Sequence, residues 1–308
     1  MGKIKTSIGG QAVIEGVMMR GPKEYAVAVR KPDGEIELKK SDVNSIIAKS
    51  KILKLPIIRG VISFFESLVV GMKCLMFSAD LFDVEVEESK FDKWLDEKLG
   101  DKAKDVAVYI SVIIAILMSI GLFMLLPAFL AGLAFKNEGE TRLWFNLLEG
   151  VVRIAIFMGY IILISRMPDI QRVFEYHGAE HKTIFCYEAE EELTVENVKK
   201  HPRFHPRCGT SFLLIVMVMA ILVFSLVPSS TVWMTLLERI ILIPLVAGLS
   251  YEIIKFAGRS ENKVVCLLNK PGLWFQRFTT REPDDSQIEV AIEALKNVMP
   301  ENREDAKW

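Results

Sequence analysis

The stretch VAVYISVIIAILMSIGLFMLLPAFLAGLAF, residues 106–135, holds no charged side chain in 30 positions. A helix that crosses a bilayer needs about 20 mostly apolar residues, so this stretch is longer than one perpendicular span. Pro127 is expected to kink or end the helix, because proline removes a main-chain donor, and this leaves Val106–Leu126 as the core span. The stretch predicts a mainly α-helical integral membrane protein and argues against buried helices of a large soluble protein.

Three more apolar blocks follow along the chain, at Leu143–Ile164, Ser211–Val227 and Val232–Phe256. Each approaches the length that a membrane-spanning helix needs. We therefore predict about four transmembrane helices, arranged as two pairs.

The composition agrees with this prediction. The 308 residues are 51% hydrophobic and 25% charged, and the net charge is −1. Such averages arise when apolar and charged residues occupy separate blocks, which excludes a soluble globule and a disordered chain. The near-neutral charge gives no sign of a nucleic-acid partner. Four scattered cysteines without a CxxC pair (Cys74, Cys186, Cys208 and Cys266) exclude a disulfide scaffold and a zinc ribbon.

Basic residues decide the predicted orientation. The long connection 166–210 holds seven lysines and arginines, and the C-terminal segment begins with Arg259 and Lys263. Basic loops stay in the cytoplasm, so this connection and both termini are expected there, with the chain in the cell membrane and the lipid bilayer as its partner. The N-terminus lacks the early apolar core of a secretory signal.

The block 55–82 is apolar but carries Arg59, Glu66, Lys73 and Asp80 at intervals of seven residues. Seven residues are nearly two helical turns, so these four side chains form one polar stripe. We favour an amphipathic helix on or in the cytoplasmic leaflet. The alternative is a fifth span, which would place the N-terminus outside.

A small cytoplasmic α+β part is predicted from the two ends of the chain. Tyr25–Val29 and Glu35–Leu38 alternate around a turn at residues 31–34, which predicts a β-hairpin, and Ala12–Met19 is a further expected strand. Apolar residues at helical spacing predict a helix over Asp285–Val298, with residues 284–286 as candidate caps. The expected parts are an N-terminal part (1–54), the amphipathic helix (55–82), a charged linker (83–105), a first transmembrane pair (106–165), a cytoplasmic His/Cys loop (166–210), a second transmembrane pair (211–257) and a tail (258–308).

The most specific local pattern is His177-Gly178-Ala179-Glu180-His181. On a helix the two histidines lie on one face, so both imidazoles can bind one ion. Glu180 can act as a further ligand or as a base. The order H-x-x-E-H is also that of the inverted zincins. The alternative interpretation is a helix cap with surface histidines.

The other two histidines lie in His201-Pro202-Arg203-Phe204-His205-Pro206-Arg207-Cys208. The prolines exclude a regular helix, and an irregular loop can bring a cysteine and a histidine beside the first pair. We expect a metal site, with zinc as the candidate ion, held by His177, His181 and Cys208 with His205 or Glu180 as fourth ligand. Contacts of the basic loop with anionic lipid head groups, and a proton-sensing histidine cluster, remain alternatives.

The N-terminal run Gly9–Pro22 places four glycines around an apolar strand that carries Glu15 and Arg20. It has neither the spacing of a dinucleotide loop nor the ending of a phosphate loop. Glycines that serve turns explain the pattern without any function. The functional interpretation makes Glu15 a base and Arg20 an anion holder at the cytoplasmic site.

Four motifs together resemble a bacterial membrane family of unknown function. They are Gly9–Pro22, Tyr176–Lys182, His205–Ser211 and Thr279–Asp285, and the resemblance covers almost the whole chain. The family is catalogued as a predicted metal-dependent enzyme. This resemblance implies that His177, Glu180, His181, His205 and Cys208 form one site, and it implies no substrate.

Two classes of function fit these observations. The first is a scaffold or regulator of other membrane proteins, whose metal or histidine loop is structural. The alternative is a membrane-embedded metal-dependent hydrolase, in which Glu180 or Glu15 accepts a proton. A small-solute transporter comes third, because the chain shows no paired broken helices. Glu149 and Arg153, four residues apart in the second span, are expected to pair and to hold the helices together.

Overall fold

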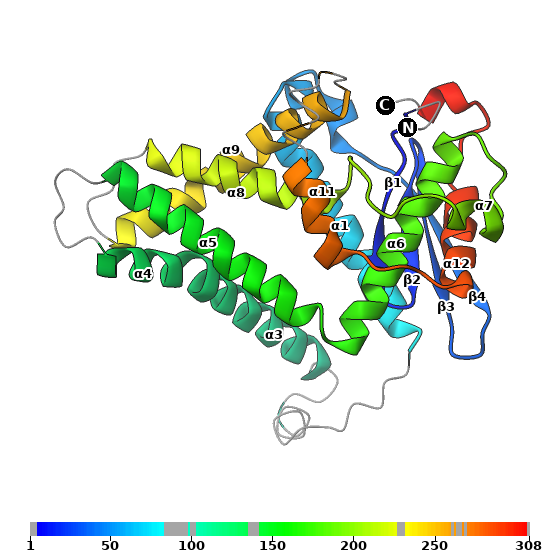
Figure 1. Ribbon diagram of the computed structural model, residues 1–308, viewed down its shortest axis with the longest axis horizontal. Coiled ribbons are helices and arrows are strands. Elements are labelled where there is room, and N and C mark those ends of the chain that lie inside the picture. Colours follow the sequence, from blue (N-terminus) through cyan, green and yellow to red (C-terminus); the bar gives the residue numbers. More distant parts are fainter. Residues whose placement is uncertain are drawn as a thin grey trace. The chain divides into compact units, whose positions relative to one another are not determined.

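The computed structural model describes residues 5–82, 103–134, 142–226, 232–259 and 270–306, together with residues 98, 262 and 267. Most of these residues are helical, and the strands form one antiparallel sheet (Figure 1). The charged linker predicted at 83–105 lies almost entirely outside the described residues, as does Cys266.

Four strands, β1 (Gly9–Val13), β2 (Gly16–Arg20), β3 (Glu24–Arg30) and β4 (Ile36–Asp42), pair in the order β1-β2-β3-β4. The helices are α1 (Ile58–Asp80), α3 (Ala103–Ile120), α4 (Leu126–Ala134), α5 (Arg142–Ile164), α6 (Pro168–Glu188), α7 (Val195–Lys199), α8 (Gly209–Ser225), α9 (Val232–Arg259), α11 (Lys270–Thr279) and α12 (Asp285–Lys296). Short 3₁₀ turns occupy η1 (Ile46–Lys49), η2 (Ile52–Lys54) and η5 (Arg303–Ala306), and a π-helical turn, η4 (Gly121–Leu125), joins α3 to α4.

The predicted hairpin is confirmed. Strands β3 and β4 pair with Arg30 opposite Ile36, and the turn between them contains Gly34 at φ +90°. Glycine adopts this left-handed conformation without steric cost. The alternating pattern and the turn residues were therefore enough to place both strands.

The single strand expected over Ala12–Met19 is wrong, because the chain reverses at Ile14 and Glu15. Val13 pairs with Gly16, so two strands stand where one was predicted. Glu15 adopts φ 48°, which costs a residue with a Cβ about 1 kcal/mol. A Cβ at Gly16 would lie 2.3 Å from the Ala28 carbonyl oxygen, so the glycine allows β3 to approach.

Both faces of the sheet are covered. One face packs against α6 and α12 through a core that includes Val17, Met19 and Ala28. The other face packs through Val13, Met18, Val27 and Val29 against the C-terminal half of α1, where Cys74 is buried. Each large side chain buried in this way contributes about 1.5–3 kcal/mol to folding.

The predicted C-terminal helix is confirmed as α12. Its N-cap is Asp284, whose carboxylate accepts from the main-chain amide of Gln287 at 2.9 Å. The Gln287 side chain accepts from the main-chain amide of Asp284, which completes a capping box. Because α12 contacts β2 and β3, both ends of the chain join in one α+β part, together with α6.

The first apolar stretch does not end at Pro127. The helix continues through α4 to Ala134, and the irregularity is the π turn Gly121–Leu125 just before the proline. A proline can stay inside a helix when the turn before it widens and the freed carbonyl finds another donor. The prediction of an end near residue 126 is therefore wrong.

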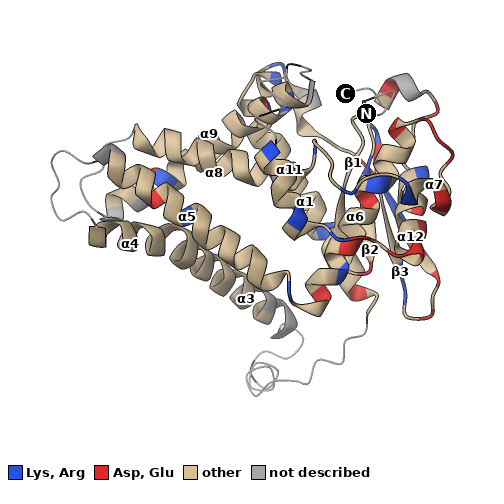
Figure 2. Cartoon of the chain, viewed as in Figure 1, with Lys and Arg blue, Asp and Glu red and all other residues tan. Residues whose placement is uncertain are grey.

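Among the described residues, four helices are long and apolar enough to cross a membrane: Ile58–Asp80, Ile110–Ala134, Trp144–Ile164 and Leu237–Ala257. Three of them fall on predicted spans. The fourth is α1, for which we favoured an amphipathic helix, whereas the predicted span Ser211–Val227 is a shorter apolar helix, Phe212–Ser225. Figure 2 shows few charges on α3, α4 and α8 and many around the sheet, α6 and α12.

The chain forms two compact units. One consists of residues 1–82, 161–223 and 239–308, and contains the sheet, α1, α6 and α12. The other consists of residues 83–160 and 224–238. In the second unit Arg153 pairs with Glu149 on one face of α5, as predicted.

Candidate metal centre

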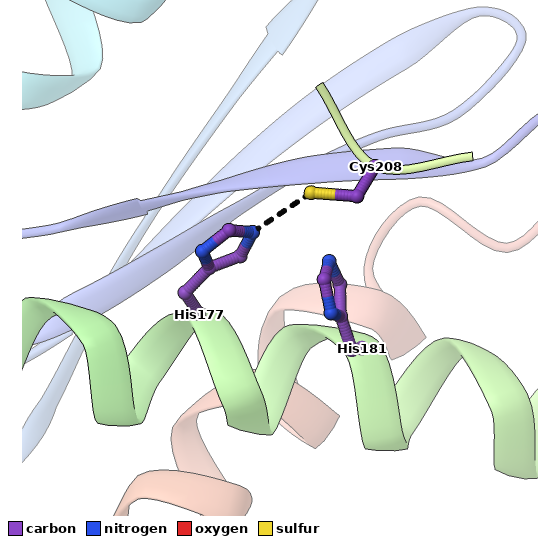
Figure 3. A group of neighbouring side chains, drawn as sticks. All are labelled: His177, His181 and Cys208. Atoms are coloured by element: carbon purple, nitrogen blue, oxygen red, sulfur yellow. Dashed lines mark hydrogen bonds between the residues drawn. The ribbon is translucent and has the colours of Figure 1, made fainter. Parts of the chain in front are cut away.

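Helix α6 carries the two histidines of the H-x-x-E-H pattern. It begins at Pro168, at the first helical position where the missing amide donor is not needed. His177 and His181 follow one turn apart on the same face, and their ring centroids lie 4.5 Å apart. Figure 3 shows both rings rising from the helix toward the same point.

Cys208 completes a group of three potential ligands. It ends the proline-containing loop between α7 and α8, and its Sγ lies 3.2 Å from Nε2 of His177. One ligand atom from each of His177, His181 and Cys208 lies within 4.8 Å of the other two (Figure 3). The predicted core of the metal site is therefore assembled by residues 31 positions apart in the chain.

Main-chain carbonyls fix the orientation of both rings. Nδ1 of His177 lies 2.8 Å from the carbonyl oxygen of Thr279, and Nδ1 of His181 lies 2.5 Å from that of Arg203. A carbonyl only accepts, so each Nδ1 is the donor and each Nε2 of a neutral ring keeps a lone pair. This is the arrangement that metal-binding histidines show.

Gly178 brings the Thr279 carbonyl within reach of His177. A Cβ at Gly178 would lie 2.0 Å from the main-chain oxygen of Arg281, so only glycine lets the segment after α11 cross α6 so closely. The amide of Arg281 donates to the Phe174 carbonyl at 2.8 Å and holds that segment in place. Two of the motifs quoted above therefore pack directly on each other.

Glu180 is buried beside the group without belonging to it. The side chain is 5% exposed, and its carboxylate accepts a hydrogen bond from the amide of Gly10. Its second oxygen, Oε2, has no hydrogen-bond partner. Burial raises the pKa of Glu180, and the nearby histidines oppose this shift. A buried carboxylate without a full set of partners is costly, which is typical of functional sites.

His177 and Cys208 strongly shift each other's pKa values. Burial raises the pKa of the Cys208 thiol, but His177 and His181 outweigh burial and hold that pKa well below its usual value. Burial lowers the pKa of His177, but the Cys208 sulfur and Glu180 raise it to about 9. These shifts favour the thiolate at Cys208, which is the form that binds metals.

His205 points elsewhere. Its Nε2 lies 3.7 Å from Oε2 of Glu188, and the other carboxylate oxygen, Oε1, accepts from Arg207 and, at 2.8 Å, from the amide of Thr6. Burial lowers the pKa of His205 to about 4. His205 is buried and the Arg207 side chain is only 8% exposed, which argues against contact of these two residues with lipid head groups.

Gln276 fixes the backbone of His205, a role that no sequence pattern indicated. The Gln276 amide accepts from the His205 main-chain nitrogen and donates to its carbonyl oxygen, both at 2.8 Å. Gln276 is fully buried. Its burial is known only from the structure, so the sequence offered no signal for this role.

Glu15, the other candidate base, lies in a separate cluster. Its carboxylate accepts hydrogen bonds from Nε and one terminal nitrogen of Arg172, and from the hydroxyl of Tyr176 at 3.3 Å. Neither Glu15 nor Arg20, at the end of β2, belongs to the group of potential metal ligands. Glu15 instead holds the β1–β2 turn to α6.

A second group of suitable ligand atoms is formed by Cys186, Glu191 and His201. Here Cys186 Sγ donates to the Glu192 carbonyl, and burial raises the pKa of this thiol to about 11. A protonated thiol is a poor ligand, so this group is the weaker of the two.

The comparisons with known proteins place this site in a family. Residues 55–301 match the family model described as a protein of unknown function (DUF1385). The chain belongs to the DUF1385 family. This finding confirms the resemblance drawn from the four motifs.

A DUF1385 relative is the uncharacterized protein YqhQ of Bacillus subtilis (strain 168). It is 36% identical over 304 residues, which cover 96% of this chain and 93% of YqhQ. No solved structure matches the chain. The relatives therefore name no reaction, and the geometry of the site carries the argument about function.

Proposed function

We propose that this DUF1385 protein is a metal-dependent hydrolase, anchored in the cell membrane by its apolar helices, with a zinc site on the cytoplasmic side. The observation that carries the proposal is the convergence of two Nε2 atoms and one Sγ within 4.8 Å, while both Nδ1 atoms face main-chain carbonyls. Each Nδ1 is bound to a carbonyl, so Nε2 is the ring atom left to bind an ion; at His177 the ion would replace the proton that Nε2 shares with the Cys208 sulfur.

The donor set fits zinc. Imidazole nitrogen and thiolate sulfur are its preferred ligands, and three protein ligands leave a fourth position open in a tetrahedral site. Nε2 of His181 is buried without a hydrogen bond, and so is Oε2 of Glu180. Such groups cost about 1–3 kcal/mol each when unsatisfied, and a bound cation would offset that cost.

The chain's own residues have distinct roles in this proposal. His177, His181 and Cys208 hold the ion, which supplies Lewis-acid activation of water. Glu180 is the proton acceptor, and the Gly10 amide holds its carboxylate in place while Oε2 stays free. Gly10 matters here because a Cβ would lie 3.0 Å from the Glu180 side chain.

A non-catalytic scaffold or regulator of other membrane proteins is the second candidate. It is favoured by the connections of the group, which joins α6, the loop before α8 and, through Thr279, the end of α11. An ion that ties three segments together stabilises the fold, and Glu180 would then be the fourth ligand.

Metal analysis of the purified full-length protein tests the zinc site. We expect one zinc per chain in the wild type and loss of zinc in His177→Ala and Cys208→Ala. His201→Ala is the matched control and retains zinc, because His201 faces Glu191 at 3.2 Å instead of the group. Zinc-free wild-type protein, or loss of zinc only in the control, would overturn the proposal.

Cobalt substitution separates the two functions. Acetohydroxamate binds a metal that has an open position, so it changes the visible spectrum of the cobalt protein if the site is catalytic. Glu180→Gln then keeps the metal. An unchanged spectrum, with metal lost in Glu180→Gln, would reject the hydrolase and support the structural role.

A further inference from the structure

The sheet and α6 must lie on the same side of the membrane. Val17, Met19 and Ala28 of the sheet share one buried core with Tyr176 and Ala179 of α6. Between them the chain passes through α1, the continuous helix α3–α4, and α5. A chain that returns to the side where it started crosses the bilayer an even number of times, so at most two of these three helices cross it. All three are nevertheless long and apolar enough to do so.

Helix α1 is the one that does not fit a span. Ile110–Ala134 contains no charged residue, and Glu149 and Arg153 of α5 pair with each other, whereas α1 carries the stripe of Arg59, Glu66, Lys73 and Asp80 along its whole length. Charged side chains at the bilayer centre are costly. Helices α6 and α12 also share a buried core, so they too lie on one side of the membrane. An even number of the long helices between them, α8 and α9, must therefore cross the bilayer. If α9 crosses, α8 crosses as well, although α8 is short for a span.

The neighbours of α1 change along its length. Near its N-terminus Gly60 packs closely against Gly248 and Tyr251 of α9, and Arg59 pairs with Glu252. These residues lie in the C-terminal half of α9, toward the end that leads to α11 and α12.

The C-terminal half of α1 lies on the sheet. Gly71 lies against the side chain of Gln11, and Ser78 accepts from the amide of Ile14 at 3.2 Å. An open sheet edge does not occur in the hydrocarbon of a bilayer. Because this half of α1 packs on the sheet, and the sheet stays outside the hydrocarbon, this half cannot continue through the bilayer.

The remaining face of α1 is apolar and exposed. One face of the helix carries Phe65, the adjacent pair Leu68 and Val69, Met72 and Met76, and each of these is between 52% and 54% exposed. Because 3.6 residues make one turn, the polar stripe lies on the flank between this row and the face on the sheet. Such a distribution is that of a helix at the surface of a membrane.

The segment before α1 has the same character. Lys51 and Lys54 are exposed and alternate with the exposed apolar residues Ile52 and Leu55. Lysines beside exposed apolar side chains favour a surface of anionic lipids.

From these observations we infer that α1 does not cross the membrane but lies along the cytoplasmic surface of the bilayer. The row from Phe65 to Met76 inserts into the acyl boundary, and Lys51 and Lys54 contact anionic head groups. The spans are then α3–α4, α5, α8 and α9. This inference does not depend on the zinc site.

The depth of spin labels in the bilayer tests the surface position of α1. Full-length protein is reconstituted for this purpose in vesicles of phosphatidylglycerol and phosphatidylcholine. Labels replace Phe65, Val69, Met72 and Met76 in turn, and Lys73 is the control on the polar flank. Residues 65 and 76 are about 16 Å apart along the axis. We expect one shallow depth at all four positions and water exposure at Lys73. A depth that changes steadily along the helix, or water exposure throughout, would overturn the inference.

Labelling with a membrane-impermeant maleimide in intact cells gives a second test that does not perturb the apolar row. Glu37→Cys places an exposed thiol before α1, and Asp80→Cys places one at the last residue of α1. The natural cysteines 74, 186 and 208 are buried, and the parent protein controls for background. Both variants should react only after the membrane is opened. Reaction of either one in intact cells contradicts the inference.

Discussion

Arg153 donates a hydrogen bond from Nε to the main-chain carbonyl of Phe123 at 2.9 Å. Phe123 lies four residues before Pro127, so its carbonyl is the one that loses its helical donor to the proline. Arg153 also pairs with Glu149, which is only 2% exposed. One arginine therefore satisfies both a broken helix and a buried carboxylate.

Replacing this arginine should destabilise the protein strongly. Arg153→Leu removes the guanidinium that donates to the buried Glu149 carboxylate and to the Phe123 carbonyl, at an expected cost of about 3–5 kcal/mol. The double variant Glu149→Leu/Arg153→Leu should cost less, because the buried carboxylate is removed together with its cation. Thermal unfolding in detergent measures both. A double variant less stable than the single one would show that the pair is not the source of stability.

Gly178→Ala should disturb the metal centre from outside the ligand set. The new Cβ would meet the Arg281 oxygen at 2.0 Å, which pushes away the segment that presents the Thr279 carbonyl to His177. We expect a loss of about 1–3 kcal/mol in stability and weaker zinc binding. Gly159→Ala is the matched control, because nothing lies within 4 Å of its Cβ position. Equal effects of the two substitutions would refute this explanation.

The buried carboxylate of Glu188 should make stability depend on pH. Burial raises its pKa, but His205, Arg207 and the Thr6 amide outweigh burial and lower it. A carboxylate with a lowered folded-state pKa stabilises the protein above its unfolded-state pKa, about 4.5, and loses this contribution as the pH falls further. Denaturant unfolding should therefore show a gap between wild type and Glu188→Gln that narrows below about pH 4.5. A gap that is constant with pH would contradict the assignment.

Glu15 should prove structural. Glu15→Gln weakens a partly exposed ion pair with Arg172 and should cost at most about 1 kcal/mol. Zinc content should be unchanged, because Glu15 is not in the ligand group. Parallel measurement of Glu180→Gln supplies the comparison at the site. Loss of zinc in Glu15→Gln alone would restore the interpretation of Glu15 as a site residue.

Local patterns predicted the local features of this protein well. The β3–β4 hairpin, the Asp284 cap of α12 and the shared face of His177 and His181 all follow from spacing within a few residues. The convergence of Cys208 on that face also followed, because the prolines before it exclude a helix.

Contacts between distant segments of the chain could not be predicted from the sequence. The carbonyls of Thr279 and Arg203 orient the histidines, but any residue carries a carbonyl, so no side-chain pattern marks them. The turn at Glu15 was missed because its left-handed conformation is stabilised by Arg172, more than 150 residues away. The partner of His205 was likewise missed, because Glu188 reads as an ordinary charged residue at a helix end.

X-ray absorption at the zinc edge of the purified full-length protein tests the central claim most directly. We predict one sulfur neighbour and two imidazoles around the zinc, with the sulfur signal absent in Cys208→Ser. A zinc shell with no sulfur, or a sulfur signal that persists in Cys208→Ser, would contradict the site formed by His177, His181 and Cys208.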